Sequence, residues 1–514
     1  MPLKYPHVLS KSRFVSGVQC SKKLFLDLNR KYLKPAITAS QQAIFDQGHI
    51  IGKMAQELYP NGVDLTSQAH YDYADAIDNT LAEMQKKTNT LYEPAFYFDE
   101  VLSVLDILQH DANGDIHAIE VKSSSKIEDY YITDAALQYW VMANAGNAPK
   151  RFSLLHINKL YVKNGAINLN DFFTLTDITA LVIQKQAWVI QHIEELKSMI
   201  RTGLEPVQAI GRHCNNPFVC DFKTHCWGNL LDKDKVFNLS NGRDKIWTLY
   251  KDGIFNLADI PVDFELSHRQ SCQVNGQRTG ATHIDSPRIH QFLNTAVYPL
   301  HFFDFETVNS TVPVLDRTSP FEQVGFQYSL HIVSNITEEP QHKEFLAQAE
   351  DFTNPQAINP RQAMINQMKL DFGTTGSIVS YYATFEKGVI ERLAEDFPED
   401  RLFLLDLNNR MVDLLDVFKN AWYYVPQMGK SASIKDVLPA LVPNLSYKTL
   451  EINNGDLANK TYMSMIDGSF KGDVNETRNN FFLSLGERIS ESLIMSLKWA
   501  VNFFIIVLPT RFAP

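Results

Sequence analysis

The sequence predicts an α/β protein in which two α/β domains are joined by a helical linker. Short apolar runs with strand-like alternation and longer stretches with helical spacing follow one another in both halves of the chain. The chain has 514 residues, enough for roughly three domains of about 150 residues each. Its composition is 45% hydrophobic and 21% charged, which is typical of a globular protein and not of a disordered one.

Changes in this pattern place the domain boundaries. We expect a first domain at 1–229, a mostly polar helical linker at 230–295, a second domain at 296–480 and an atypical tail at 481–514. Within the linker, residues 251–254 and 257–261 fit either a helix–hairpin–helix turn or a plain helical connection.

The elements of the first domain follow from periodicity and turn residues. We expect helices at 8–33, 43–58, 133–145 and 177–200, and strands at 95–98, 101–108, 116–123 and 152–162. The turn chemistry of 111–115 makes the second and third of these strands a β-hairpin. In the second domain, strands are expected at 300–305, 321–333 and 377–382, with helices between them.

Charge and hydropathy exclude some classes of protein. A net charge of −11 and a pI of about 5.8 argue against retention on nucleic acid by bulk positive charge. Local basic patches would have to supply such contacts, and one candidate patch, equally readable as a solvated helix face, comprises Lys11, Arg13, Lys22, Lys23, Arg30, Lys31 and Lys34. The first residues have no apolar core, and the longest apolar run, 499–509, is too short to span a bilayer. We therefore expect a cytoplasmic protein with no membrane association.

The hairpin carries the first candidate site. Glu120 and Lys122 lie two residues apart on one strand and so point to the same face, and Asp106 lies on the neighbouring strand. Two carboxylates suit Mg²⁺ or Mn²⁺, and a lysine beside them can orient water or stabilise a phosphorane. A surface hairpin with alternating charges is the alternative for these residues alone.

With Gln138 on the following helix, this set resembles the RecB-like PD-(D/E)XK nucleases. The resemblance implies a restriction-endonuclease-like core in which Asp106 and Glu120 bind the metal, Lys122 is catalytic and Gln138 supports the site. The sequence departs from the family at 48–52, where His49 lies next to a glycine and not at the family's position. Glu93 is either an extra acidic member or an ordinary strand-edge charge.

Four cysteines form the second candidate feature. Cys214, Cys220 and Cys226 are evenly spaced, and Cys20 stands far upstream. In a reduced compartment such cysteines are metal ligands or bystanders, and their spacing permits zinc or an iron–sulfur cluster. The arrangement is similar to that of CRISPR-associated RecB-like exonucleases, which implies a 4Fe–4S cluster. Cys272 is expected to be a bystander.

The second domain carries a further pair of acids. Asp304 and Glu306 lie on one face of an apolar strand, which resembles the first motif of DEDD exonucleases of the ribonuclease H-like fold. Residues 381–386 resemble the second motif, with Glu386 in place of its aspartate, so the resemblance implies that Asp304, Glu306 and Glu386 bind metal. The last acid of that family has no clear counterpart, although Tyr462 and Asp467 have a loosely suitable spacing. A degenerate and a working domain are therefore both compatible with the sequence.

The order of these features is similar to a bacterial family described only as a domain of unknown function. Together they predict a Mg²⁺- or Mn²⁺-dependent nuclease that cleaves phosphodiester bonds, with DNA preferred to RNA, in repair, recombination or defence. The alternatives are a catalytically degenerate nucleic-acid-binding or scaffold protein, and an RNA 3′-exonuclease acting through the second domain. The sequence does not specify whether the substrate is single- or double-stranded, the polarity of cleavage or any protein partner.

Overall fold

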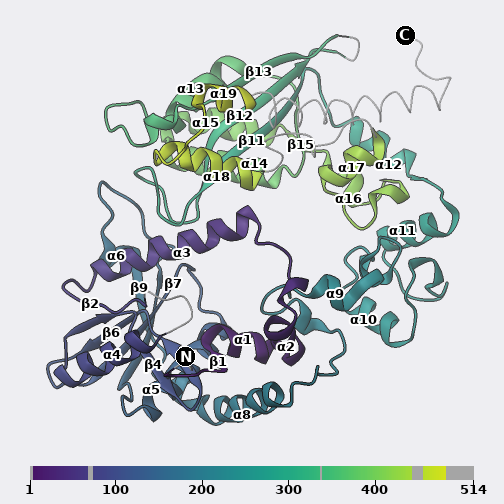
Figure 1. Cartoon of the computed structure of the whole chain (residues 1–514). Coiled ribbons are helices and arrows are strands. Elements are labelled where there is room, and N and C mark those ends of the chain that lie inside the picture. The colour runs from purple at the N-terminus through teal and green to yellow at the C-terminus, as the bar shows by residue number, and fades with distance from the viewer. Residues whose placement is uncertain (1–3, 68–72, 336–337, 443–454, 482–514) are drawn as a thin grey trace, which may run out of the picture. The chain divides into compact units, whose positions relative to one another are not determined.

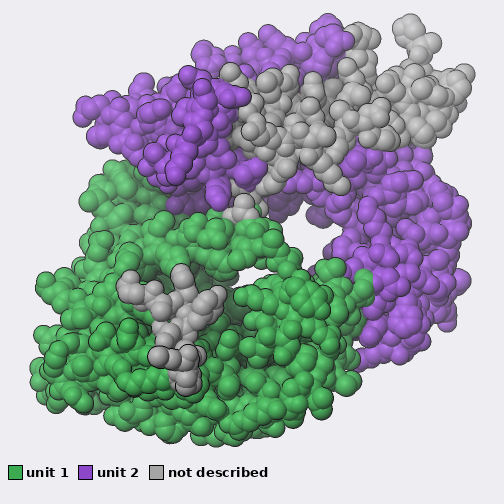
Figure 2. Space-filling view, in the orientation of Figure 1, with its two compact units in different colours: residues 1–228, 311–321 green, residues 229–310, 322–514 purple. Residues whose placement is uncertain are grey.

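A computed structural model of the chain divides into two compact units (Figures 1 and 2). The structure describes residues 4–67, 73–335, 338–442 and 455–481. The first unit comprises residues 1–228 and 311–321, and the second comprises 229–310 and 322–514. The predicted linker, 230–295, therefore clusters with the second unit, and the predicted tail, apart from Phe481, lies outside the described residues.

A six-stranded mixed sheet organises the first unit. Its strand order is β2-β3-β6-β7-β8-β9, with β7 near the centre. β7 pairs antiparallel with β6 and parallel with β8, so it is hydrogen-bonded on both edges. The strands are β2 (Val63–Asp64), β3 (Thr90–Tyr92), β6 (Ile107–His110), β7 (Ile116–Lys122), β8 (Arg151–Ile157) and β9 (Phe173–Asp177).

A smaller sheet corrects the expected strand at 101–108. The chain forms β5 (Val101–Val104) there, and β6 begins at Ile107. Leu105 and Asp106, between the two strands, belong to neither. β5 pairs with β4 (Ala95–Phe98) and β1 (Leu9–Ser10), whereas β6 pairs with β7 and β3. Because two sheets share this stretch, Asp106 lies at the junction between them and not inside one long strand.

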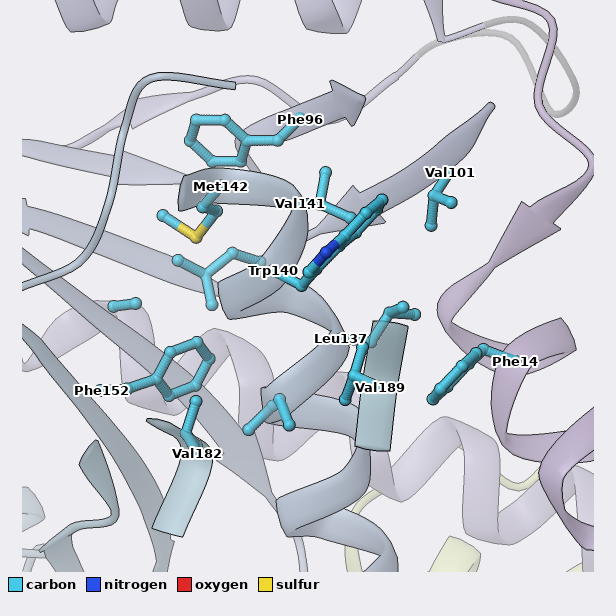
Figure 3. Packing of buried hydrophobic residues seen from close by; sticks show 14 of the residues in the cluster. Phe14, Phe96, Val101, Leu137, Trp140, Val141, Met142, Phe152, Val182 and Val189 are labelled. Atoms are coloured by element: carbon cyan, nitrogen blue, oxygen red, sulfur yellow. The ribbon is translucent and has the colours of Figure 1, made fainter. Parts of the chain in front are cut away.

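Helix α5 (Asp129–Asn144) lies in the core of the first unit (Figure 3). It is apolar on nearly all sides, which is the pattern of a helix enclosed by other elements. Leu137, Trp140 and Val141 pack there with Phe14 and Phe96. Gln138, on the same helix, is consequently held in a fixed position.

The remaining helices of the first unit differ from expectation where the chain breaks. The stretch 8–33 forms α1 (Lys11–Gln19) and α2 (Ser21–Asn29), which are separated by Cys20 in an extended conformation with φ −165°. The stretch 177–200 likewise divides at Lys185. The other helices are α3 (Ala39–Glu57), α4 (Ala74–Lys86), α6 (Leu169–Phe172), α7 (Thr179–Gln184), α8 (Gln186–Thr202) and α9 (Lys223–Trp227).

A five-stranded mixed sheet forms the second unit's core, in the order β13-β12-β11-β14-β15. β11 (Leu300–Asn309) is central, pairing antiparallel with β12 (Gln323–Val333) and parallel with β14 (Ile378–Ser380). The edge strands β13 (Gln341–Leu346) and β15 (Met411–Asp413) pair antiparallel with β12 and parallel with β14. The accompanying helices are α13 (Pro360–Asp371), α14 (Thr384–Asp396), α15 (Arg401–Asn409), α18 (Gly455–Ile466) and α19 (Val474–Phe481).

Residues 230–295, which were expected to be a linker, form a small helical layer of the second unit. α10 (Arg243–Lys251) ends at a turn in which Gly253 has φ +76°, and residues Leu257–Asp259 form a 3-10 turn. α11 (His268–Thr279) and α12 (Ser286–Leu293) follow, with β10 (His283–Ile284) between them pairing with β16 (Tyr423–Tyr424). The short helices α16 (Leu415–Lys419) and α17 (Ile434–Leu441) flank β16 in the sequence. Within the described ranges, no helix combines the length and the apolar character needed to cross a membrane.

Candidate functional site

The centre of the first site is Glu120, a buried carboxylate on β7. Its Oε1 accepts hydrogen bonds from Lys122 Nζ at 2.8 Å and from Lys11 Nζ at 2.7 Å. Its Oε2 accepts a hydrogen bond from Gln138 Nε2 at 2.8 Å. Three side chains from β7, α1 and α5 therefore converge on one carboxylate, so Glu120, Lys122 and Gln138 lie together.

Asp106 lies next to this carboxylate at the junction of the two sheets. Its Oδ2 accepts a hydrogen bond from the Val121 N–H at 2.6 Å, and its main-chain oxygen accepts one from the Glu93 N–H at 3.1 Å. Burial, together with the charge of Glu120, raises the pKa of Asp106 to about 7. Burial and the charge of Asp106 likewise raise the pKa of Glu93 to about 8. Asp106 and Glu93 therefore hold protons more readily than isolated carboxyl groups do.

Glu120 behaves differently because two cations contact it. Burial alone would raise the pKa of this carboxyl, but Lys11 and Lys122 lower it to about 2. Lys122 is affected in the opposite direction. Burial opposes the charge of its ammonium group, but the neighbouring Asp134 and Glu120 hold the pKa of Lys122 well above its usual range. Glu120 is thus an anion and Lys122 a cation at neutral pH.

Two members of the site, Lys11 and Asp134, were not predicted as such. Lys11 was noted only within a basic patch, and it lies instead at the first turn of α1, directed at Glu120. Asp134, on α5, accepts a hydrogen bond from Lys122 at 2.9 Å. Helical spacing could have suggested Asp134, because it precedes Gln138 by one turn and so lies on the same face.

A cavity of about 370 Å³ opens beside these acids. Glu93 and Asp106 line it, and so does Lys11 together with its neighbours Ser10 and Ser12. A cation, hydroxyl groups and carboxylates around one cavity suit a polar, anionic ligand that is bridged by a metal ion.

The donor set fits Mg²⁺ or Mn²⁺. Asp106, Glu120 and Glu93 offer only oxygen ligands, which hard divalent cations prefer. Asp134 Oδ1 and Gln138 Oε1 are buried and have no hydrogen-bond partner among the described residues. Unsatisfied buried oxygens next to crowded carboxylates are the environment that a cation with its bound waters would complete.

The four predicted cysteines line one small cavity of about 20 Å³. Cys214 and Cys220 are buried, and Cys20 and Cys226 are half-buried. The extended conformation at Cys20, between α1 and α2, places its thiol at this cavity. Sequence positions about 200 residues apart therefore line the same cavity in the first unit.

Polar contacts clamp the N-terminal helices to the cysteine segment. Gln19 Nε2 donates to the main-chain oxygens of His213 at 2.8 Å and Phe218 at 2.6 Å. Lys22 pairs with Glu205 at 2.9 Å, and Lys34 pairs with Asp221 at 2.8 Å. Several cations of the candidate basic patch therefore form ion pairs with acidic side chains of the same unit.

The second acidic centre lies on β11. Burial raises the pKa of Asp304 to about 7, and burial with the Asp304 charge raises that of Glu306 to about 8. Glu386, in the first turn of α14, has a pKa raised to about 9 by burial and by Asp304. Burial also raises the pKa of Asp413, which lies at the end of β15. The charge of Asp413 in turn contributes to the raised pKa of Glu386. The predicted acids Asp304, Glu306 and Glu386 therefore form one electrostatic group, and Asp413 joins it.

The expected landmark for the last acid lies elsewhere. Tyr462 is fully buried, stacks on Phe326 at 3.9 Å and donates a hydrogen bond to the Ala347 oxygen. It is a core residue of α18, and Asp467 follows the end of that helix. The same helix begins near the acids, because a Cβ on Gly455 would lie 3.6 Å from Glu306 Oε2.

Comparisons with known proteins match part of the chain. Residues 301–433 match a family described as a domain of unknown function, DUF2779. The chain is 28% identical over 169 residues to the "Uncharacterized protein MG366 homolog" of Mycoplasma pneumoniae, covering 30% of this chain and 25% of that protein. It is 28% identical over 172 residues to the "Uncharacterized protein UU173" of Ureaplasma parvum, covering 30% and 24%. The match thus spans about a quarter of the length of these relatives.

Proposed function

We propose that the protein is a metal-dependent nuclease whose active site is formed by Asp106, Glu120 and Lys122. The observation that carries this proposal is the convergence of Lys122, Lys11 and Gln138 on the buried Glu120, beside Asp106. An ordinary surface hairpin would leave such charges in water, where they need no partners. Here they contact one another around the buried Glu120, beside a cavity, which is where perturbed groups commonly serve catalysis.

The residues divide the chemistry between them. A bound Mg²⁺ or Mn²⁺ would supply Lewis-acid stabilisation of the phosphoryl oxygens and lower the pKa of a bound water. Asp106 and Glu120 would hold that ion, and Gln138 keeps Glu120 oriented through its hydrogen bond at 2.8 Å. Lys122 would stabilise the negative charge that develops on the phosphate, and Asp134 fixes the Lys122 ammonium from the other side at 2.9 Å.

We propose DNA as the substrate class because the motif set resembles that of RecB-like nucleases. The net charge of −11 means that binding depends on local contacts and on the metal. Lys11, which lines the cavity, is one candidate contact for a backbone phosphate.

We further propose that the four cysteines hold a 4Fe–4S cluster and not zinc. A tetrahedral zinc site with bonds of about 2.3 Å brings its sulfurs within about 3.8 Å of one another. Among the described residues, no three of these four thiols lie within 4.8 Å of each other, although all four line one cavity. In a cubane each thiolate binds a different iron, so the sulfurs stand further apart. The observed spread fits the cluster better.

The nuclease assay uses the full chain, purified anaerobically, with Mn²⁺ and end-labelled single-stranded DNA, duplex DNA and RNA. We expect DNA cleavage by the wild type and at least a 100-fold loss in Lys122→Met. Lys126→Met is the matched control, because Lys126 is an exposed lysine four residues along the same segment. Equal activity in Lys122→Met and wild type would reject the site. DNA binding without cleavage by the wild type would instead support a non-catalytic scaffold.

A second candidate activity rests on the second unit. Its strand order, with an antiparallel β11-β12-β13 meander continued by parallel β14 and β15, resembles that of ribonuclease H-like folds and supports this proposal. Asp304, Glu306, Glu386 and Asp413 would hold a metal pair for exonucleolytic cleavage. Asp304→Asn in the Lys122→Met background tests this: residual 3′-end trimming of RNA or DNA that disappears on adding Asp304→Asn assigns the activity to β11. No trimming before that change would mean a degenerate domain.

A further inference from the structure

A third group of metal-ligating side chains lies in the second unit, away from both acidic centres in the sequence. His268, Cys272 and His283 each offer a ligand atom, and these atoms all lie within 4.8 Å of one another. It is the one group of three histidine, cysteine or acidic ligands this close among the described residues. Cys272 had been expected to be a bystander, so the sequence alone did not reveal the group.

Helix α11 supplies two of the ligands from one face. His268 is its first residue and Cys272 follows one turn later, so both side chains project to the same side. A capping box between Ser267 and Gln270 fixes where the helix begins. Arg269 anchors the same turn, because its guanidinium donates hydrogen bonds to the main-chain oxygens of Phe418 and Ser431. The two ligands are therefore held on a fixed helical turn.

The third ligand comes from a different element. His283 belongs to β10, which pairs with β16 through His283 and Tyr424. The imidazoles of His268 and His283 lie with centroids 5.2 Å apart and planes at 73°. His283 Nε2 is buried and has no hydrogen-bond partner in the part of the chain that the structure describes. A buried ring nitrogen without a partner is costly unless a ligand satisfies it.

The distances match a tetrahedral cation. Cys272 Sγ lies 3.7 Å from His268 Nε2. Bonds of about 2.3 Å to sulfur and about 2.05 Å to nitrogen at a tetrahedral angle separate the two ligand atoms by about 3.6 Å. A thiol hydrogen bond to His268 would give the same distance, but it would not account for His283, whose buried nitrogen is left unsatisfied.

We propose that His268, Cys272 and His283 bind a zinc-like divalent cation. One thiolate and two imidazoles are borderline-to-soft ligands, which select zinc, cobalt or similar ions and disfavour Mg²⁺ and Ca²⁺. Three protein ligands leave the fourth position for water, on the side where His268 is exposed. The ion ties the start of α11 to β10 and hence to the β10–β16 pair, so it stabilises the helical layer of the second unit. This inference is independent of the proposed nuclease activity.

Zinc analysis of the full chain tests the proposal. Wild type, His268→Ala, Cys272→Ser and the control His290→Ala are incubated with zinc chloride, desalted and analysed by mass spectrometry for zinc per chain. His290, on α12, is a nearby histidine outside the group. We expect His268→Ala and Cys272→Ser to bind one equivalent less than wild type and His290→Ala to match it. This difference holds whatever metal the four-cysteine site carries.

Cobalt gives a second readout that does not depend on stability. The wild type minus Cys272→Ser difference spectrum should contain a near-ultraviolet thiolate-to-cobalt charge-transfer band, and His268→Ala should weaken it. Because His268 is exposed, its replacement leaves the core of the unit intact. Equal zinc content in wild type and both ligand variants, or a difference spectrum without a thiolate band, would overturn the proposal and leave a thiol–imidazole hydrogen bond.

Discussion

Lys11 Nζ lies 2.7 Å from Glu120 Oε1, although 109 positions separate the two residues in the sequence. The same ammonium lies 4.0 Å from Asp134 Oδ2. Lys11 and Lys122 thus share one carboxylate, and each stands beside an additional acid. A lysine from outside the hairpin is therefore part of the candidate nuclease site, and its role can be separated from that of Lys122.

We predict that Lys11→Met lowers the rate of DNA cleavage by at least 10-fold and weakens substrate binding. The charge of Lys11 helps to keep Glu120 ionised, and its position on the cavity wall suits a phosphate contact. Steady-state cleavage at several Mn²⁺ concentrations measures both effects. Lys86→Met, at a lysine that is 66% exposed, is the control. Higher activity or tighter Mn²⁺ binding in Lys11→Met would instead mean that Lys11 competes with the ion for Glu120.

The parts of the site predictable from sequence are those that local spacing brings together. Glu120 and Lys122 share one face of a strand, and Gln138 follows on the next helix, so periodicity alone orients them. Lys11 reaches the site only because α1 packs against α5, which is a tertiary contact with no local signal. The break at Asp106 was missed for a similar reason: an apolar run does not show which of two sheets each half of it joins.

We predict that Cys220→Ser yields a colourless protein with a lower thermal midpoint, whereas Cys272→Ser keeps the visible spectrum of wild type. Cys220 lines the four-cysteine cavity, and a bound cluster links Cys20 to the segment 214–226 across a long loop. Absorbance near 400 nm and iron analysis after anaerobic purification check the result. An equally coloured Cys220→Ser protein would remove this cysteine from the ligand set.

Cys20 also shows where helix prediction fails. The stretch 8–33 has helical spacing throughout, but the chain adopts an extended conformation at Cys20 and resumes the helix at Ser21. The thiol is thereby placed at the cavity shared with the other three cysteines. Helix propensity cannot predict such a break, because the other cysteines at this cavity lie about 200 residues away in the chain. The strands β11 and β12 were easier to predict, since both are long and mostly buried on both faces, whereas the shorter edge strands β13 and β15 were not predicted.

We predict that Gly376→Ala destabilises the second unit by more than about 3 kcal/mol. Gly376 has φ +88°, which costs an alanine about 1–2 kcal/mol, and its added Cβ would overlap the main-chain oxygen of Pro299. Gly146→Ala isolates the first term, because Gly146 has φ +83° but open space around it. Gly388→Ala, at an exposed position within α14, should stabilise by up to about 1 kcal/mol. Urea unfolding ranks the three, and similar losses for Gly376→Ala and Gly146→Ala would contradict the predicted overlap.

The stability of the second unit should fall as the pH drops from about 6.5 to about 4. Burial and the neighbouring His342 lower the pKa of His331 to about 4, while the unfolded chain titrates near 6.5. Between these values the unfolded state binds more protons, so stability is complete above pH 6.5 and is lost by up to about 3 kcal/mol on acidification. Urea midpoints at pH 7.5 and 5 measure the effect. His331→Gln should flatten this dependence, and an unchanged slope would assign it to other groups.

Asp304→Asn should stabilise the metal-free protein and abolish its stabilisation by Mn²⁺. Burial and the charge of Asp304 raise the pKa of both Glu306 and Glu386, so ionisation of Asp304 opposes ionisation of the other two carboxyl groups. Removing the central charge should raise the free energy of unfolding in EDTA at pH 8 by on the order of 1 kcal/mol, the equivalent of about one pKa unit. Mn²⁺ should raise the wild-type thermal midpoint of this unit but leave that of Asp304→Asn unchanged, because an ion that binds only the folded state stabilises it by mass action.

Asp316→Asn is the control, since that exposed aspartate lies on the first unit and pairs with Lys163. A lower stability of Asp304→Asn in EDTA, or an equal Mn²⁺ response in both proteins, would mean that the acids of β11 are a structural network and not a metal site.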